Sequence, residues 1–198
     1  MTTIALSGNA GGAGAFTIAV PSSANIQTLT LPDATTTLVG QGGTITAGAA
    51  ITSATGTSLD FPSIPSWVKR ITISIDSISF AALGVAVVRL GVSNTLVTTG
   101  YVAARVGFTT TPATVYTAVT DGVASFGATV AAAAATGQIV ITNLTGNQWV
   151  ASGQVTRTTD NVYMSTTGSI TLAGTLTNLS LVATTSTFDA GSINILYE

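Results

Sequence analysis

The chain has 198 residues and contains neither cysteine nor histidine, which excludes disulfides, thiolate metal sites and catalysis by either side chain. Charged residues make up 6% of it, against about a quarter in ordinary globular proteins. The net charge of −2 leaves no electrostatic footprint for nucleic acid. A surface built from hydroxyls and amides favours a chain that buries much of itself against other copies or other proteins.

Residues 1–56 predict an extended N-terminal arm. Within it, residues 26–40 indicate a β-hairpin, because apolar residues alternate with threonines on both sides of a Pro32-Asp33 turn. A lone hairpin is only marginally stable in water. We therefore expect a homotrimer in which the arms contact one another through the apolar residues of this hairpin, namely Leu29, Leu31, Leu38 and Val39. Residues 41–56 are rich in Gly, Ala and Thr and predict a linker or extended segment.

A hinge follows the arm. Pro62 and Pro65 block helix formation, and Trp67 is a large apolar anchor directly after them. The next residues alternate between isoleucine and small polar residues, which is the period of a half-buried strand. The alternation slips between Ile75 and Ile78, which predicts a β-bulge near Asp76.

Residues 57–198 predict a compact domain of short strands separated by turn signals. This spacing favours an all-β fold, an antiparallel β-sandwich of jelly-roll type, over alternating strands and helices. Thr145–Gln148 predicts a tight hairpin turn, and Ala131–Ala135 a loop or strand edge. The expected strands are Leu59–Phe61, Val68–Phe80, Val85–Val92, Tyr101–Val106, Val115–Val119, Ile139–Leu144, Gln148–Val155, Ser169–Leu172 with Leu179–Ala183, and Ser192–Tyr197.

No residue pattern in the chain predicts a reaction. The seven carboxylates are dispersed, and most sit at turn signals, although Asp60 and Asp76 fall on strands. We therefore expect no catalytic residue, no metal site and no cofactor, and the chain is not expected to be an enzyme. No apolar run reaches the roughly 18–20 residues of a membrane span, so membrane insertion is not expected either.

Aromatic residues are the candidate ligand contacts. Tyr101, Tyr116 and Tyr163 could stack on sugar rings if their side chains are exposed, and packing in the core or an interface is the alternative. For Trp149, which lies inside an expected strand, burial in the core is favoured.

Two sets of residues carry a resemblance to known proteins. Residues 28–40 contain TLPDATTTLVG, which is similar to an element near the start of tailed-bacteriophage tail-fibre and related virion proteins. A second set resembles a C-terminal domain found in many phage structural proteins, and it comprises Ile64–Ile71, Thr99–Tyr101, Asn147–Gly153 and Phe188–Glu198, the last of which reads FDAGSINILYE.

The resemblance implies a non-enzymatic structural protein of the virion, a homotrimer, with other phage virion proteins as partners. A short tail-fibre-like protein that adheres to a host surface glycan is one expectation. The other is a capsid decoration protein, of the cement or head-fibre kind, anchored by its N-terminal arm. The two expectations differ in whether the tail or the capsid carries the chain.

Overall fold

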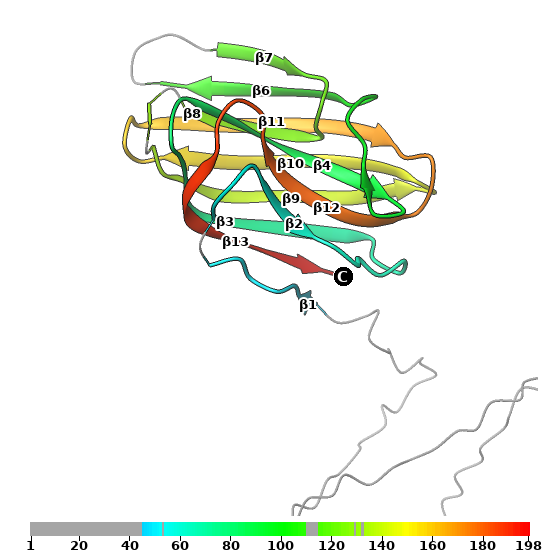
Figure 1. Ribbon diagram of the computed structural model, residues 1–198. Coiled ribbons are helices and arrows are strands. Elements are labelled where there is room, and N and C mark those ends of the chain that lie inside the picture. The colour runs from blue at the N-terminus through cyan, green and yellow to red at the C-terminus, as the bar shows by residue number, and fades with distance from the viewer. Residues whose placement is uncertain (1–44, 53, 110–114, 129, 132) are drawn as a thin grey trace, which may run out of the picture. The chain divides into compact units, whose positions relative to one another are not determined.

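The computed structural model describes residues 45–52, 54–109, 115–128, 130–131 and 133–198. The chain divides into the units Met1–Leu38 and Val39–Glu198, and every described residue belongs to the second. Within the described residues all regular structure is β-strand and every strand pair is antiparallel. The predicted antiparallel β-sandwich is thereby confirmed (Figure 1).

The larger sheet has eight strands in the order β1-β13-β3-β9-β10-β11-β6-β7. Its centre is a meander in which β9, β10 and β11 follow one another along the chain and pair in sequence. The strands are β1 (Thr46–Ala47), β3 (Arg70–Phe80), β6 (Val102–Phe108), β7 (Val115–Val119), β9 (Ala135–Thr145), β10 (Gln148–Arg157), β11 (Val162–Thr171) and β13 (Phe188–Tyr197).

The smaller sheet covers one face of the larger one (Figure 1). In it β12 pairs with β2 on one side and with β4 on the other, and both β5 and β8 pair with β4. The strands are β2 (Ser58–Phe61), β4 (Gly84–Val92), β5 (Thr95–Leu96), β8 (Ala124–Ala128) and β12 (Leu176–Ala183).

The core lies between the two sheets and is filled from alternate positions of their strands. Ile71, Ile73 and Ile139 of the larger sheet are fully buried, as are Leu179 and Leu181 of the smaller one. An aromatic cluster closes one region of this core, where the Phe80 ring lies 5.3 Å from Phe188 and 6.2 Å from Phe126 between ring centroids. The alternation of isoleucine with threonine and serine in β3 thus produces one apolar and one polar face.

Two local predictions from the sequence are confirmed. The register of β3 with β9 shifts between Ile75 and Ile78, and Ser77 within this bulge has a φ of 54°. The β9–β10 hairpin turns through Gly146 and Asn147, and Gly146 has a φ of 52°, a left-handed value that glycine adopts without steric cost.

The segment before β2 is part of the sandwich, although the sequence placed residues up to 56 in the arm. β1 pairs with the end of β13, Ile51 forms a bridge with Ile193, and Gly56 forms one with Phe188. Ala54 between them is fully buried. Residues 46–52 and 54–56 therefore follow β13 in the antiparallel direction as an interrupted edge strand. Residues 1–44 of the expected arm lie outside the described residues.

Trp67 anchors the C-terminal strand as well as the hinge. Its half-buried ring lies 5.8 Å from the ring of Tyr197, and the backbone N–H groups of Lys69 and Arg70 donate to the carbonyl oxygen of Glu198 at 2.8 and 2.9 Å. The chain therefore enters β3 fixed against its own C-terminus.

No helix long and apolar enough to cross a membrane occurs among the described residues.

Candidate ligand-binding face

The outer surface of the neighbouring strands β9, β10 and β11 consists largely of hydroxyl and amide side chains. Register aligns Thr136 with Thr156, and Gln138 with Gln154, while their neighbours in sequence point into the core. The same register continues across β11. We call this surface the hydroxyl face and define it by the outward residues Thr136, Gln138, Ser152, Gln154, Thr156, Tyr163, Ser165 and Thr167.

The hydroxyl face is hollowed and uncharged. A shallow depression of about 490 Å³ lies along it, lined by these residues together with Val140 and the backbone of Gly137 and Gly153. The outward positions of β9, β10 and β11 include no charged residue. Because ions bind poorly to a surface without charge, the depression suits a neutral polar ligand.

Most polar side chains of the hydroxyl face are available to a ligand. Two are engaged at its β3 border. Thr136 Oγ1 accepts from the Ser77 N–H at 3.0 Å and donates to Asp76 Oδ1 at 3.4 Å, and Gln138 Nε2 donates to Ser74 Oγ at 3.4 Å. Within the described chain, no hydrogen bond engages the side chains of Ser152 or Gln154, both of which are exposed. Paired hydroxyls and amides at strand spacing can donate to and accept from successive hydroxyls of a polyol.

An aromatic pair borders the depression. Tyr163 on β11 is 38% exposed and Phe108 at the end of β6 is 48% exposed, and their ring centroids lie 6.0 Å apart. The Tyr163 side chain also lines the depression. An exposed ring beside hydrogen-bonding groups is the arrangement that holds a sugar ring by its apolar face while its hydroxyls bond at the side.

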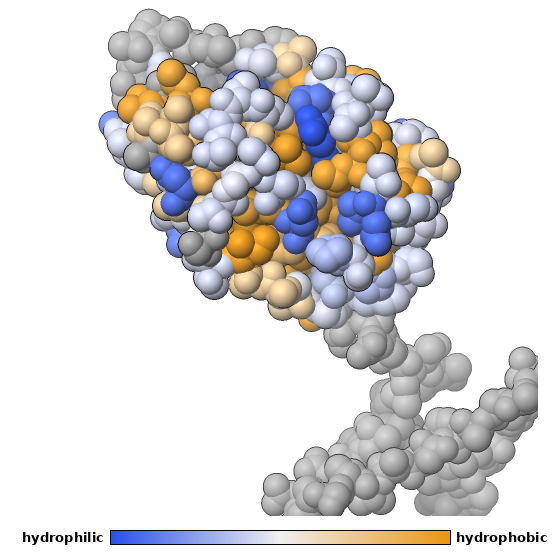
Figure 2. All heavy atoms as spheres, viewed as in Figure 1, coloured by the Kyte–Doolittle hydropathy of each residue, from blue (hydrophilic) through white to orange (hydrophobic). Residues whose placement is uncertain are grey.

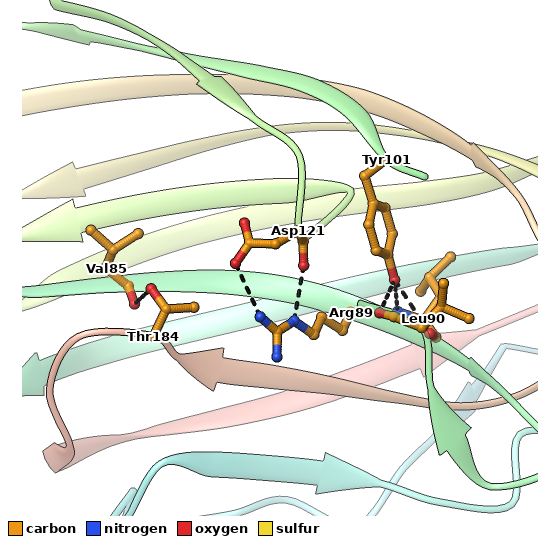
Figure 3. A network of polar contacts seen from close by, with 7 residues as sticks. Val85, Arg89, Leu90, Tyr101, Asp121 and Thr184 are labelled. Atoms are coloured by element: carbon orange, nitrogen blue, oxygen red, sulfur yellow. Dashed lines mark hydrogen bonds and ion pairs between the residues drawn. The ribbon is translucent and has the colours of Figure 1, made fainter. Parts of the chain in front are cut away.

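Tyr101 is not a surface contact, so its expected role in glycan binding is wrong. The side chain is 3% exposed, and its hydroxyl accepts from the Leu90 N–H and donates to the Val97 carbonyl oxygen, both at 2.9 Å (Figure 3). Burial raises the pKa of Tyr101, an effect that the Leu90 hydrogen bond opposes. Tyr101 thus ties the end of β4 to the loop before β6.

The remaining aromatic candidates differ in where the structure places their side chains. Tyr163 is exposed at the depression, as binding would need. Tyr116 belongs to β7, opposite Val106 in register, and its side chain lies outside the described residues. Trp149 is 4% exposed, which confirms its expected place in the core. The arm residues Leu29, Leu31, Leu38 and Val39 also lie outside the described residues.

The carboxylates lie apart and have structural partners. Asp60 Oδ1 accepts from the hydroxyls of Ser58 and Ser180, both at 2.5 Å, and Asp76 accepts from Ser77 at 3.1 Å. Asp121 pairs with Arg89 at 3.0 Å (Figure 3). Among the described residues no three acidic side chains come together in a way that could hold a metal ion.

Strongly hydrophilic residues are also sparse on the opposite side of the molecule. Figure 2 shows the side on which β2, β4 and β12 lie, and a few strongly hydrophilic residues are scattered there among weakly hydrophilic and hydrophobic ones. Among the described residues, these two sides therefore carry hydroxyls, amides and apolar groups with scattered charges, and neither shows a concentrated charged patch.

Comparisons with family models, with curated proteins and with solved structures give no match to this chain. The fold and the hydroxyl face define the class of the protein: an all-β sandwich with an uncharged, hollowed outer face and an aromatic border.

The sequence predicts which residues of the hydroxyl face point outward, but it does not predict that they form one surface. Alternation in Gln138-Ile-Val-Ile141 and in Ser152-Gly-Gln-Val155 predicts which residues point outward, but not that these strands are neighbours. Pairing of β10 with both β9 and β11 brings the polar residues into one surface.

Proposed function

We propose that this chain is a non-enzymatic structural protein of a tailed-phage virion, short, trimeric and tail-fibre-like, and that it uses the hydroxyl face to bind a neutral glycan on the host surface. The observation that carries the binding part is the depression of about 490 Å³, uncharged across β9–β11 and bordered by the Tyr163–Phe108 pair. The resemblance of residues 28–40 to tail-fibre proteins supports the virion part.

The chemistry of the face fits adhesion and supports no reaction. Its outward side chains on β9–β11 are hydroxyls, amides and apolar groups, with no carboxylate, amine or guanidinium among them. Binding of a neutral glycan by such groups is weak at one site. Three copies in one particle component would raise the apparent affinity through multivalency.

A panel of neutral and acidic bacterial polysaccharides tests this function with the full-length protein. We expect retention of a neutral polysaccharide, and at least about tenfold weaker retention for Tyr163→Ala or Gln154→Ala, since each removes a stacking surface or a hydrogen-bonding group from the depression. Leu83→Ala is the matched control, because Leu83 is 63% exposed and does not line the depression. Equal retention by all three variants would exclude the hydroxyl face as the binding site.

Capsid decoration is the second candidate, and a different surface favours it. The outward residues of β6 are Val102, Ala104, Val106 and Phe108, of which Val102 is 76% exposed. An exposed apolar row is more useful against another protein than against a glycan. Copy number separates the candidates: hundreds of copies per purified virion, by gel densitometry, would refute the tail location, and a few tens or fewer would refute decoration.

A further inference from the structure

A second cavity lies on the inner side of the larger sheet, behind the hydroxyl face. It measures about 290 Å³ and opens between β6 and β11 of the larger sheet and β4 and β8 of the smaller one. We call it the arginine cavity because two guanidinium groups line it, those of Arg105 and Arg157. The remaining lining residues are Gly84, Val85, Gly107, Thr109, Thr117, Gly127, Ala128, Val162 and Met164.

The two arginines meet at Gly127 of β8. Arg157 is 2% exposed and donates from Nη1 to the Gly127 carbonyl oxygen. Arg105 Nη1 lies 3.0 Å from the position that a Cβ would take at Gly127, and it donates to Ser125 Oγ at 3.0 Å. Glycine at position 127 therefore leaves the space in which both guanidinium groups approach the same strand.

The charges in the arginine cavity do not balance. Arg157 pairs with Asp160 at 2.6 Å, Arg89 with Asp121 and Arg70 with Glu198, both at 3.0 Å. Among the described residues no carboxylate lies within ion-pair distance of Arg105, whose guanidinium group donates to the neutral hydroxyl of Ser125. The cavity therefore holds one positive charge more than it holds negative charges.

The environment makes that excess charge costly. Burial lowers the pKa of Arg105, and the positive charge of Arg157 lowers it further, while the negative charge of Asp121 raises it. A half-buried cation without a counter-ion is destabilising in a medium of low dielectric constant. An anion that entered the cavity would meet the guanidinium group of Arg105, whose donors suit carboxylate geometry, close to the positive charge of Arg157.

The apolar walls of the arginine cavity indicate what the ligand carries besides its anionic group. Val85, Val162 and Met164 are apolar, and Ala128 adds a further apolar surface. An inorganic anion would leave these walls unused, whereas an apolar body attached to the anion would bury against them. We propose that the arginine cavity binds a small amphipathic monoanion, a carboxylate carried on a short aliphatic body, with the carboxylate at Arg105 and the body against Val85, Val162 and Met164.

Calorimetric titration of the full-length protein tests this site, with hexanoate as the probe. Hexanamide has the same shape without the charge, and sulfate has charge without the apolar body. We expect hexanoate to bind at least about tenfold more tightly than either, because only hexanoate combines a charge-assisted hydrogen bond with burial of a charged ligand's hydrocarbon tail. Equal binding of hexanamide or of sulfate would overturn the assignment, as would the absence of hexanoate binding at millimolar concentration.

Two variants locate the binding. Arg105→Gln removes the excess charge and should weaken hexanoate binding at least about tenfold, whereas Arg70→Gln, on an exposed ion pair elsewhere, should leave it unchanged. Gly107→Leu places a side chain in the cavity and leaves both arginines in the sequence: a Cβ there lies 3.8 Å from both Met164 Cγ and Val162 Cγ1, which is ordinary contact. It should abolish binding. Unchanged binding in Arg105→Gln, or in a folded Gly107→Leu, would refute the proposal.

Discussion

At the scale of single residues, the buried hydroxyl of Tyr101 stabilises the fold through hydrogen bonds that its sequence context does not predict. Replacing it with phenylalanine leaves the buried Leu90 N–H without the acceptor that it has at 2.9 Å. An unmade buried hydrogen bond costs about 1–3 kcal/mol. We therefore expect Tyr101→Phe to lower the urea midpoint at an unchanged m-value, and Tyr163→Phe, at an exposed ring, to stay within about 0.5 kcal/mol of the parent. Similar midpoints for the two variants would contradict this.

The same residue predicts a loss of stability in alkali. Burial raises the pKa of Tyr101 above its ordinary 10.0, so the folded state keeps the proton at a pH where the unfolded state has released it. The unfolded state then binds fewer protons, and the free energy of unfolding falls as pH rises past about 10. Tyr101→Phe lacks this component, so the stability gap between parent and variant should narrow from pH 9 to 11. A stability difference that widens or stays constant over this pH range would contradict the assignment of the alkaline loss of stability to Tyr101.

Ion pairs at different depths should differ in strength. Arg157 and Asp160 expose 3% and 17% of their side chains, against 51% and 41% for Arg70 and Glu198. Breaking a buried pair leaves an uncompensated charge and costs about 3–5 kcal/mol, whereas an exposed pair contributes about 0–1 kcal/mol. Asp160→Asn should therefore destabilise the protein strongly and Glu198→Gln weakly, in parallel urea titrations. Comparable effects of the two substitutions would contradict the difference in depth.

At the scale of elements, the sequence was informative wherever one face is apolar and the other polar. β3, β4 and β7 appear close to their expected positions, because branched residues alternate with small polar ones or run continuously there. β8 was missed, since four of its five residues, Ala-Ser-Phe-Gly-Ala, are small, and all five are buried without alternation. β11 was recognised only at its end, because Thr166 and Gly168 occupy inward positions that normally hold apolar residues.

The binding surfaces depended on contacts that a single sequence does not encode locally. Tyr163 was a candidate from its residue type, but the hydroxyls beside it come from two further strands. The arginine cavity was not predicted at all, because Arg105 and Arg157 are 52 positions apart and meet only where β8 packs across β6 and β10. Tyr101 failed as a surface candidate because residue type does not distinguish an exposed ring from a buried one.

The edge segment before β2 leads to a prediction about truncation. A chain that begins at residue 45 retains β1, the Ile51–Ile193 bridge and buried Ala54, so we expect it to fold with a single cooperative transition. A chain that begins at residue 57 loses all of these and exposes the edge of β13. It should unfold at a lower urea concentration. Equal midpoints for the two truncated chains would show that the edge segment adds no stability.

At the scale of the whole molecule, the low charge bears on assembly. Only 12 of 198 residues are charged, and three of the five cations of the chain are neutralised by carboxylates within the fold. Such a protein has little electrostatic repulsion to keep copies apart. The exposed apolar row on the outer side of β6 adds a surface that suits contact with another copy of the chain or with a different protein.

We accordingly predict a homotrimer, with the hairpin expected in residues 26–40 as its main contact. Three hairpins together would share the apolar side chains that one hairpin cannot bury alone. Mass photometry of the full-length protein should give the mass of three chains of 19.6 kDa. Leu29→Asp combined with Leu38→Asp should shift the mass to that of one chain, because charge in an apolar contact opposes association.

A chain beginning at residue 45 separates the two surfaces that could hold the trimer together. It keeps the sandwich and the β6 row but lacks the expected hairpin, so it should be monomeric if the arm is the main contact. In virions assembled with this shortened protein in place of the full chain, the sandwich should then be missing, since the arm is also the proposed attachment to the particle. A trimer formed by the shortened chain would instead assign assembly to the sandwich, and its normal incorporation would refute the arm as the anchor.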